Sequence, residues 1–469
     1  MNSTACPRGQ SPLSPERNGN PNRQPVRKDL GLGTGSPHHF CIANRPFCCQ
    51  RDGPVSQTRK ALESPQAEGE IDIARLVDAL VADAIEAQSS DIHIEPWDTS
   101  LVVRFRLHGV LKEFEHLPLQ LAEKISARLK VMANLVNYET ERPQEGHARA
   151  DLMAGGVELR LSFFPVVRGG EGHSFARGEK IVIRIFDPSS RSFDVDELGF
   201  DQQTAATLKE LLDRPTGMLL LTGPTGSGKT TAIYAALCHL VNRHGSTISI
   251  STVEDPVEFN LSQISQAQIN HAREFTYPVA LRSLMRQDPQ VIMIGEIRDP
   301  ETASIAVQAG LTGHLVISTI HSGSTAGVFA RMINMEIEPF LLASSIIGVL
   351  GLRLVRKNCP LCSMPYQPDP TLLTKVPSDL LPEASWRRGG GCETCNQTGF
   401  AGRTALAEML TVNEPIQDAI MTKMRTRKLQ ALAQEHGMQT LWESGMARST
   451  SGEIPLEEVL RSVTEDPLT

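Results

Sequence analysis

The segment GPTGSGKT at residues 223–230 has the residue types and spacing of a phosphate-binding loop. The apolar run MLLLT precedes it, and the helix-forming sequence GKTTAIYAALCHLV continues from it. Glycines in such a loop let backbone N–H groups face phosphate oxygens, and the helix start adds the positive end of its dipole. Lys229 would neutralise the β and γ phosphates, and the Thr230 hydroxyl would hold Mg²⁺. The expected nucleotide-binding residues are Gly223, Pro224, Thr225, Gly226, Ser227, Gly228, Lys229, Thr230 and Thr231.

Carboxylates end two further predicted strands. VIMIGE ends in Glu296, and TVEDPVE places Glu254 at the end of the strand before it. We expect an acidic group on a strand neighbouring that of the phosphate loop, because a carboxylate there can hold Mg²⁺ through water or orient the attacking water. The alternatives are a helix cap for Glu296 and a solvated strand end for Glu254. The pair predicts hydrolysis in addition to nucleotide binding.

Two histidines bound the next apolar strand, LVISTI. His314 precedes it and His321 follows it. A strand of this length separates them by roughly 20 Å, at ~3.3 Å per residue, so only one can lie at the phosphate end. Ligands bind at the carboxyl ends of parallel strands, which selects His321 as the candidate γ-phosphate sensor. A buried, hydrogen-bonded structural histidine is the alternative.

Four of the nine cysteines form two CxxC pairs late in the chain. The intervening segment, 363–391, is longer than the ~15–20 residues usual between zinc knuckles. Four thiolates can still close a tetrahedral zinc site, and such a site is structural because no position stays open for water. A redox pair or unliganded thiols are the alternatives. The predicted zinc ligands are Cys359, Cys362, Cys392 and Cys395.

Strands alternate with helices from about residue 200, which predicts an α/β fold with a mostly parallel sheet covered on both faces. The preceding part mixes amphipathic helices with strands, as in a small α+β domain. Residues 1–66 are rich in Pro, Gly, Asn, Ser and Arg without periodicity, which indicates disorder. The predicted organisation is a disordered segment 1–66, an α+β domain 70–190 and an ATPase domain 198–465 that includes the cysteine-framed insert 359–395 and the C-terminal helices 411–465.

The composition excludes several classes of protein. Hydrophobic residues make up 40% and charged residues 21% of the 469 residues, as in soluble globular proteins. A net charge of −8 and 5% aromatic residues oppose a nucleic-acid translocase, which needs basic stripes and base-stacking aromatics. No apolar run reaches the ~20 residues of a membrane span, and no signal pattern opens the chain, so we expect a cytoplasmic protein.

The chain contains five long segments of interest: GPTGSGKTT, TVEDPVEF, LRSLMRQDPQVIMIGEIRDPETASIAVQAGLTGHLVISTIHS, EPFLLASSIIGVLGLRLVRKNCPLC and CETCNQTGFAGRTALAEML. Together they resemble the type II secretion and type IV pilus assembly ATPase family, of the general secretory pathway E type. The resemblance runs from about residue 71 to 465 and implies a RecA-like domain joined to an N-terminal domain that is PAS-like in the family. It further implies a homo-hexamer, peripheral at the cytoplasmic face of a bacterial inner membrane, that uses ATP, Mg²⁺ and Zn²⁺. Inner-membrane platform and docking proteins would be its partners, and no specific nucleic acid is expected.

In family terms, residues 223–231 match the Walker A box, 252–259 the Asp box, 291–299 the Walker B box and 309–322 the His box. The resemblance also implies that strand arginines reach a neighbouring subunit's nucleotide, with Arg160 and Arg104 ranked above Arg106 and Arg184. A solvated sheet face is the alternative for these arginines. The family's assembly motors carry a tetracysteine insert that its retraction motors lack, so the insert favours an assembly motor.

The chain departs from the family pattern at several places. Leu107-His108-Gly109 stands where Asp-Gly is usual, His147 replaces an arginine, and the loop 168–179 is longer. The usual N-terminal docking domain is not recognisable in 1–66. The leading hypothesis is an ATPase that powers pseudopilus assembly and protein export by a type II secretion system. A type IV pilus or DNA-uptake motor shares this core, and a nucleic-acid translocase or a non-catalytic scaffold are alternatives from other classes.

Overall fold

The computed structural model describes residues 56–63, 71–150, 156–169, 175–186, 193–378, 380–381 and 384–463. Most of the segment 1–66, expected to be disordered, lies outside these residues. The part from Gln57 to Glu63 differs from that expectation, since it forms helix α1. The Asp83 carboxylate accepts the backbone N–H groups of Gln57 at 2.9 Å and Thr58 at 2.8 Å, which caps the helix from a distant part of the chain. Periodicity within 1–66 carries no sign of this contact.

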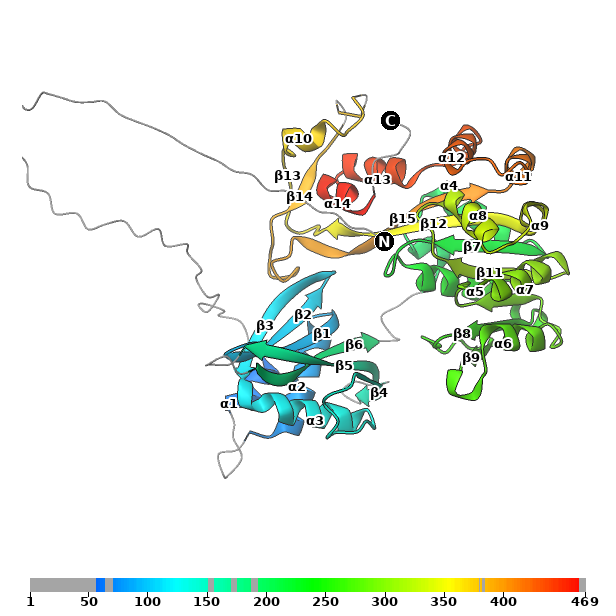
Figure 1. The fold of residues 1–469 in the computed structure, drawn as a ribbon. Coiled ribbons are helices and arrows are strands. Elements are labelled where there is room, and N and C mark those ends of the chain that lie inside the picture. Colours follow the sequence, from blue (N-terminus) through cyan, green and yellow to red (C-terminus); the bar gives the residue numbers. More distant parts are fainter. Residues whose placement is uncertain are drawn as a thin grey trace, which may run out of the picture. The chain divides into compact units, whose positions relative to one another are not determined.

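The N-terminal part of the described chain is an antiparallel sheet with helices, as the α+β prediction requires (Figure 1). Its strand order is β3-β2-β1-β6-β5-β4. Leu76 and Leu80 are fully buried on α2 and pack in one core with Ile92 and Ile94 of β1. The elements are α2 (Ile73–Glu86), β1 (Ser89–Pro96), β2 (Ser100–Leu107), β3 (Val110–Pro118), a 3-10 turn (Leu119–Leu121), α3 (Ala122–Met132), β4 (Gln144–Ala150), β5 (Val157–Gly169) and β6 (Phe175–Phe186).

The second sheet has seven strands in the order β15-β12-β7-β11-β10-β8-β9 (Figure 1). Every neighbouring pair is parallel except β12 with β15. This agrees with the predicted mostly parallel sheet. The strands are β7 (Gly217–Thr222), β8 (Ile250–Glu254), β9 (Ser265–Gln268), β10 (Val291–Ile294), β11 (Leu315–Ile320), β12 (Ile346–Asn358) and β15 (Phe400–Thr411).

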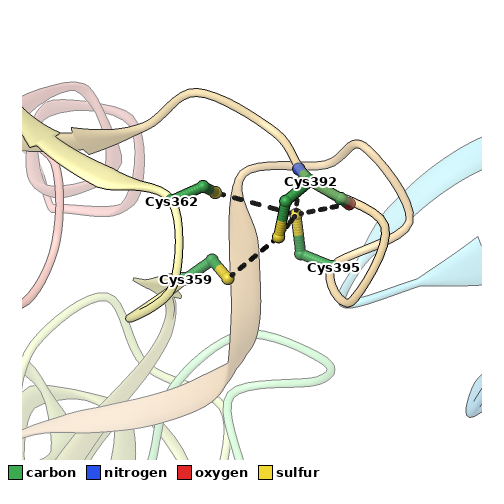
Figure 2. Close-up of side chains that lie close together, drawn as sticks. All are labelled: Cys359, Cys362, Cys392 and Cys395. Carbon is green, nitrogen blue, oxygen red and sulfur yellow. Dashed lines mark hydrogen bonds between the residues drawn. The ribbon is translucent and has the colours of Figure 1, made fainter.

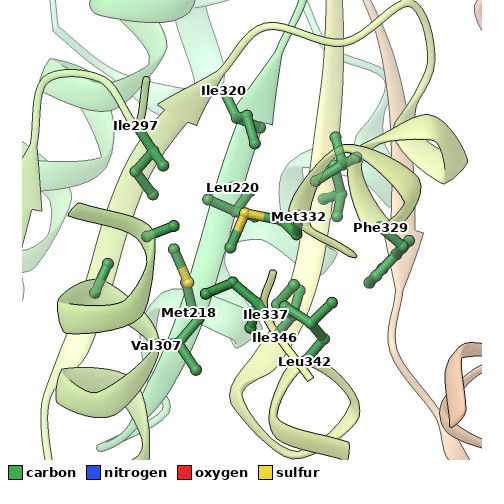
Figure 3. Close-up of a cluster of buried hydrophobic side chains, with 14 of the residues drawn as sticks. Met218, Leu220, Ile297, Val307, Ile320, Phe329, Met332, Ile337, Leu342 and Ile346 are labelled. Carbon is green, nitrogen blue, oxygen red and sulfur yellow. The ribbon is translucent and has the colours of Figure 1, made fainter. Parts of the chain in front are cut away.

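Helices cover both faces of this sheet, and β7 shows how the sequence directs them. Met218 and Leu220 belong to a core under α7, α8 and α9 (Figure 3), while Leu219 and Leu221 join a second core with residues of α4 and α5. Successive side chains on a strand point to opposite faces, so the continuous apolar run feeds both cores. The helices are α4 (Gln202–Leu212), α5 (Lys229–His244), α6 (Tyr277–Leu284), α7 (Pro300–Leu311), α8 (Thr325–Asn334) and α9 (Pro339–Ser345), with 3-10 turns at Val195–Glu197, Gly245–Thr247 and His271–Arg273.

A small insert and a helical tail complete the described chain. β13 (Ser363–Pro365) pairs with β14 (Arg387–Gly389) as a two-stranded ribbon, with α10 (Pro370–Leu373) between them. The tail is helical, as expected. Its buried Glu458 forms ion pairs with Arg356 of β12 and with Arg461, the latter at 2.9 Å. The tail helices are α11 (Glu414–Met421), α12 (Thr426–Glu435), α13 (Leu441–Thr450) and α14 (Leu456–Ser462).

Candidate active site

The loop between β7 and α5 has the backbone that a phosphate cradle requires. Gly223, Gly226 and Gly228 have φ angles of 147°, 77° and 97°, which side-chain-bearing residues rarely adopt. A Cβ on Gly223 would lie 2.5 Å from the Leu352 carbonyl oxygen and 2.7 Å from Ser227 Oγ, so this position has room only for glycine. Gly228 is the residue immediately before α5. The loop therefore directs the N-terminal end of that helix toward a bound anion.

Lys229 lies across this loop. Its Nζ donates to the carbonyl oxygens of Gly223 at 2.7 Å and Pro224 at 3.0 Å. Partial burial lowers the pKa of Lys229, and the charge of Arg353 lowers it further, whereas the charge of Glu296 raises it. In a nucleotide complex, phosphate oxygens would replace the two carbonyl oxygens as partners of Lys229 Nζ. Thr230, the next residue of α5, would hold Mg²⁺, which would neutralise charge on the phosphates.

Glu296 follows β10 by two residues, and its side chain is 16% exposed. His321 Nε2 lies 3.1 Å from Glu296 Oε1, and Arg298 Nε donates to Oε2 at 2.8 Å. The hydrogen bond to Glu296 raises the pKa of Arg298. The alternative role of Glu296 as a helix cap is filled by Asp299, which accepts the N–H of Thr302 at the start of α7.

The strand order corrects one expectation. Glu296 was expected on a strand neighbouring that of the phosphate loop, but β11 lies between β7 and β10. His321, at the carboxyl end of β11, therefore stands between the loop and Glu296. His314 lies at the opposite end of the same strand, with its Nδ1 3.1 Å from the Ala309 carbonyl oxygen. The structure thus brings His321 to the site and leaves His314 away from it, as the strand polarity predicts.

Glu254 ends β8, the neighbour of β10, and the residue is buried, with 4% of its surface exposed. Oε1 accepts hydrogen bonds from the Thr252 hydroxyl at 2.6 Å and from Gln266 Nε2 at 3.0 Å, and Oε2 accepts one from the Tyr234 hydroxyl. Burial and the bond to Glu254 raise the pKa of Tyr234. The solvated strand end considered for Glu254 is therefore wrong, because three donors enclose the carboxylate.

The two arginines ranked highest are on the N-terminal sheet. Arg104 forms an ion pair with Glu95, and its guanidinium lies 5.8 Å from the ring centroid of Trp97. The Arg160 guanidinium stacks 4.5 Å from the ring centroid of Phe186. Both side chains are partly buried. The fully solvated face considered for them is not what the structure contains, and their role toward nucleotide stays a prediction.

Arg353 is a site residue that sequence reasoning missed. β12 runs parallel to β7 with Gly351 opposite Thr222, so the strand continues past the phosphate loop. The half-buried Arg353 donates to the carbonyl oxygens of Leu352 at 2.9 Å and Gly323 at 3.3 Å. Burial lowers its pKa. In the sequence, Arg353 is recognisable only as an arginine at the end of a long apolar segment. The strand order is needed to show that this segment passes the phosphate loop.

The four predicted cysteine ligands come together from two separate turns (Figure 2). Their Sγ atoms all lie within 4.8 Å of one another, with separations of 3.9 Å for Cys359–Cys392 and for Cys362–Cys395 and 3.7 Å for Cys392–Cys395. Zn–S bonds of about 2.3 Å in a tetrahedron place sulfurs about 3.8 Å apart. The donor set therefore fits zinc. The ribbon of β13 and β14 occupies the intervening segment, which is why its length does not prevent the cluster.

Backbone N–H groups favour a thiolate at one of these cysteines. Burial raises the pKa of Cys395, but N–H groups of Cys392 and Gly399, each 3.2 Å from its Sγ, lower the pKa to about 6. Thiolates are the form that binds metal.

In the part of the chain that the structure describes, no helix is both long and apolar enough to cross a membrane.

Comparisons with known proteins agree with this geometry. The family described as type II/IV secretion system protein matches residues 66–461. The type IV pilus assembly ATPase PilB of Myxococcus xanthus is 40% identical over 415 residues, 87% of this chain and 71% of that protein. The type II secretion system protein E of Aeromonas hydrophila is 40% identical over 414 residues, 87% of this chain and 80% of that protein.

Solved structures support the fold alone. The Legionella pneumophila ATPase DotB aligns with a TM-score of 0.60 at 18% identity, covering 82% of this chain and 94% of that chain. The pilus retraction motor PilT with bound ADP aligns with a TM-score of 0.56 at 23% identity, covering 83% and 97%. The phosphate loop, the sheet order and the relatives together establish that the chain belongs to the type II/IV secretion system protein family and is an ATP hydrolase.

Proposed function

We propose that this protein is the hexameric motor of a type II secretion system, which hydrolyses ATP to power pseudopilus assembly and protein export. The observation that carries the proposal is the convergence of the phosphate loop, Glu296 and His321 at the carboxyl end of one parallel sheet. It would work at the cytoplasmic face of the inner membrane, together with platform and docking proteins.

Each side chain of the site takes a definite role in this proposal. Lys229 and the loop N–H groups hold the β and γ phosphates. Glu296 orients the attacking water, and His321 reports the γ-phosphate to Glu296, since the two side chains are already 3.1 Å apart. Glu254 holds a second water or a metal-bound water with the lone pair that its three donors leave free. Arg353 adds positive charge beside the loop.

The proposal requires an oligomer, a hexamer, because the arginines of the N-terminal sheet are proposed to act on the nucleotide of a neighbouring subunit. Arginine fingers supplied by another subunit stabilise charge that develops on the phosphates. Arg160 and Arg104 are the candidates, and the guanidinium group of each lies over an aromatic ring, that of Phe186 and that of Trp97. A site completed in this way is active only in the assembled motor.

Mixing two inactive variants tests this arrangement. Lys229→Ala and Arg160→Ala should each give inactive assemblies, while co-assembly should restore turnover at sites that combine an intact loop with an intact neighbouring arginine. Mixing Lys229→Ala with Glu296→Gln is the matched control, because both residues serve the same chain's site and no chain is then complete. ATP turnover is measured on the hexameric fraction from sedimentation. An Arg160→Ala mixture no more active than the control mixture contradicts the proposal.

A type IV pilus or DNA-uptake motor is the second candidate, since the pilus assembly ATPase of Myxococcus xanthus is as similar as the secretion proteins, at 40% identity. Deleting the gene separates the two. A secretion motor predicts loss of extracellular enzymes with surface pili unchanged. Loss of pili or of DNA uptake with normal secretion selects the second candidate instead.

A further inference from the structure

Tyr234 lies at the centre of a buried hydrogen-bond network beside the nucleotide site. It is fully buried on α5, the helix that begins with Lys229. Its hydroxyl donates to the Glu254 carboxylate and accepts the backbone N–H groups of Glu258 at 3.2 Å and Phe259 at 3.4 Å. One hydroxyl therefore joins the phosphate-loop helix, the end of β8 and the segment that follows it.

Aromatic packing fixes the position of this hydroxyl. The rings of Phe193 and Phe259 pack edge-on against Tyr234, with centroids 5.4 Å and 6.0 Å away. Edge-to-face packing of this kind restrains the orientation of a ring beyond what burial alone does. The position of the Tyr234 hydroxyl is therefore fixed by its ring. To keep the hydrogen bond, the Glu254 carboxylate must adjust to the hydroxyl.

Gln266 of β9 closes the network from the opposite side. Its Oε1 accepts the Leu261 N–H at 2.7 Å, and its Nε2 donates to Glu254 at 3.0 Å and to the Phe259 carbonyl oxygen at 3.0 Å. Of the roughly four lone-pair sites of a carboxylate, Glu254 uses three on Tyr234, Thr252 and Gln266. The direction of the remaining lone pair is therefore set by these three partners.

We propose that Tyr234 is a positioning residue for ATP hydrolysis, which transmits the position of the phosphate-loop helix to the Glu254 carboxylate. The proposal rests on the role proposed above for Glu254. Phosphate would replace the carbonyl oxygens of Gly223 and Pro224 as partners of Lys229, which changes the contacts that hold the first turn of α5. Tyr234 stands on the next turn, so Glu254 Oε2 follows the helix.

The variant Tyr234→Phe removes the hydroxyl and keeps the ring. We expect kcat to fall about 10- to 100-fold, because misplacement of a catalytic group by about 1 Å can cost about 100-fold, while the Kd for ATP changes less than about threefold. The matched control is Tyr366→Phe. The Tyr366 hydroxyl likewise donates to a carboxylate, Glu457 at 2.8 Å, and accepts a backbone N–H, that of Leu456 at 3.3 Å. It measures the effect of losing such a hydroxyl elsewhere in the fold.

Thr252 supplies an independent arm, since its hydroxyl donates to the other oxygen of Glu254. Thr252→Val should lower kcat in the same way, and Thr252→Ser, which keeps the hydroxyl, should restore it. If Thr252 had only a structural role, the loss of kcat in each variant would parallel its loss of thermal stability. The hydroxyl of Ser would then give no advantage in kcat over Val. The double variant of Tyr234→Phe with Glu254→Gln should be no slower than Glu254→Gln alone, because Tyr234 acts through Glu254.

Three results would overturn the inference. The first is a kcat for Tyr234→Phe within about twofold of the Tyr366→Phe control. The second is a double variant in which the two effects multiply. The third is equal loss of ATP affinity and kcat. Full turnover in Glu254→Gln would remove the role of Glu254 on which the inference rests, while the proposed function would fail only if Lys229→Ala and Glu296→Gln also kept full turnover.

Discussion

His321 Nε2 lies 3.1 Å from Glu296 Oε1, at the ends of two adjacent parallel strands. The other carboxylate oxygen, Oε2, accepts hydrogen bonds from Arg298. Glu296 is therefore contacted on both carboxylate oxygens, and β11, which carries the histidine, lies between the strand of Glu296 and the strand of the phosphate loop. A γ-phosphate that drew the imidazole toward itself would free one oxygen of Glu296 for water.

Glu296→Gln should preserve ATP binding and block turnover. The amide keeps the shape of the side chain but loses the charge that orients water, and positioned acid–base groups contribute about 100- to 10,000-fold to rate. Lys229→Ala should abolish turnover as well, with weakened ATP binding. Phosphate release and equilibrium nucleotide binding distinguish the two effects. ATP turnover within a few-fold of the wild-type rate in either variant would contradict the catalytic roles assigned to Glu296 and Lys229.

The purified protein should contain about one zinc ion per chain, because four sulfurs already have the spacing of a tetrahedral site. Cys395→Ser should lower the zinc content and the melting temperature together, since metal binding contributes to folding. Cys238→Ser is the control, because Cys238 is a half-buried thiol on α5 outside the cluster. The Cys238→Ser protein should therefore keep the full zinc content of the wild type. A folded wild-type chain without zinc would reject the site.

Glu458 should make stability depend on pH in the acid range. Burial raises the pKa of Glu458, but hydrogen bonds from Arg356 and Arg461 overcome it and lower the pKa to about 2, from an ordinary value of 4.5. A depressed carboxyl pKa contributes stability above the unfolded-state value, and the contribution is lost as pH falls toward the folded-state value. Glu458→Gln should therefore cost about 2–3 kcal/mol of unfolding free energy near neutral pH.

The difference between wild type and Glu458→Gln should shrink between pH 4.5 and about pH 2, the window set by the two values. Urea unfolding of both proteins across that range measures it. Glu301→Gln serves as the control, because its ion pair with Arg282 is more than half exposed on both sides and should contribute less than about 1 kcal/mol. A pH-independent difference would contradict the assignment of the ion pair.

Lys130 is fully buried, with Nζ 2.7 Å from Glu179 Oε1 and 2.6 Å from the Glu139 carbonyl oxygen. Lys130→Met should destabilise the N-terminal domain by about 3–5 kcal/mol, because it leaves the Glu179 carboxylate buried without its cation. Adding Glu179→Gln should recover part of that loss. Chemical denaturation followed by domain-specific hydrogen exchange measures both, and a double variant less stable than Lys130→Met would refute the explanation.

The sequence by itself determined the phosphate loop, the two CxxC pairs, the α/β alternation and the end of the parallel strands at which His321 lies. These features depend on residues close together in the chain, where the spacing of glycines, the period of apolar residues and the polarity of a strand leave few alternatives. Two expectations that reached further were altered by the structure: Glu296 stands one strand farther from the loop, and Gln57–Glu63 is a helix capped by Asp83.

Only the tertiary structure decided that the strand of Arg353 passes the phosphate loop, that three donors enclose Glu254, and that Tyr234 joins α5 to Glu254. Each of these relationships depends on which strands become neighbours and in which register. Strand pairing and burial are properties of contacts between distant parts of the chain, so no local pattern encodes them. The chemistry of this ATP hydrolase can therefore be recognised from consecutive residues, while the surroundings of each site residue depend on how the sheet brings distant segments together.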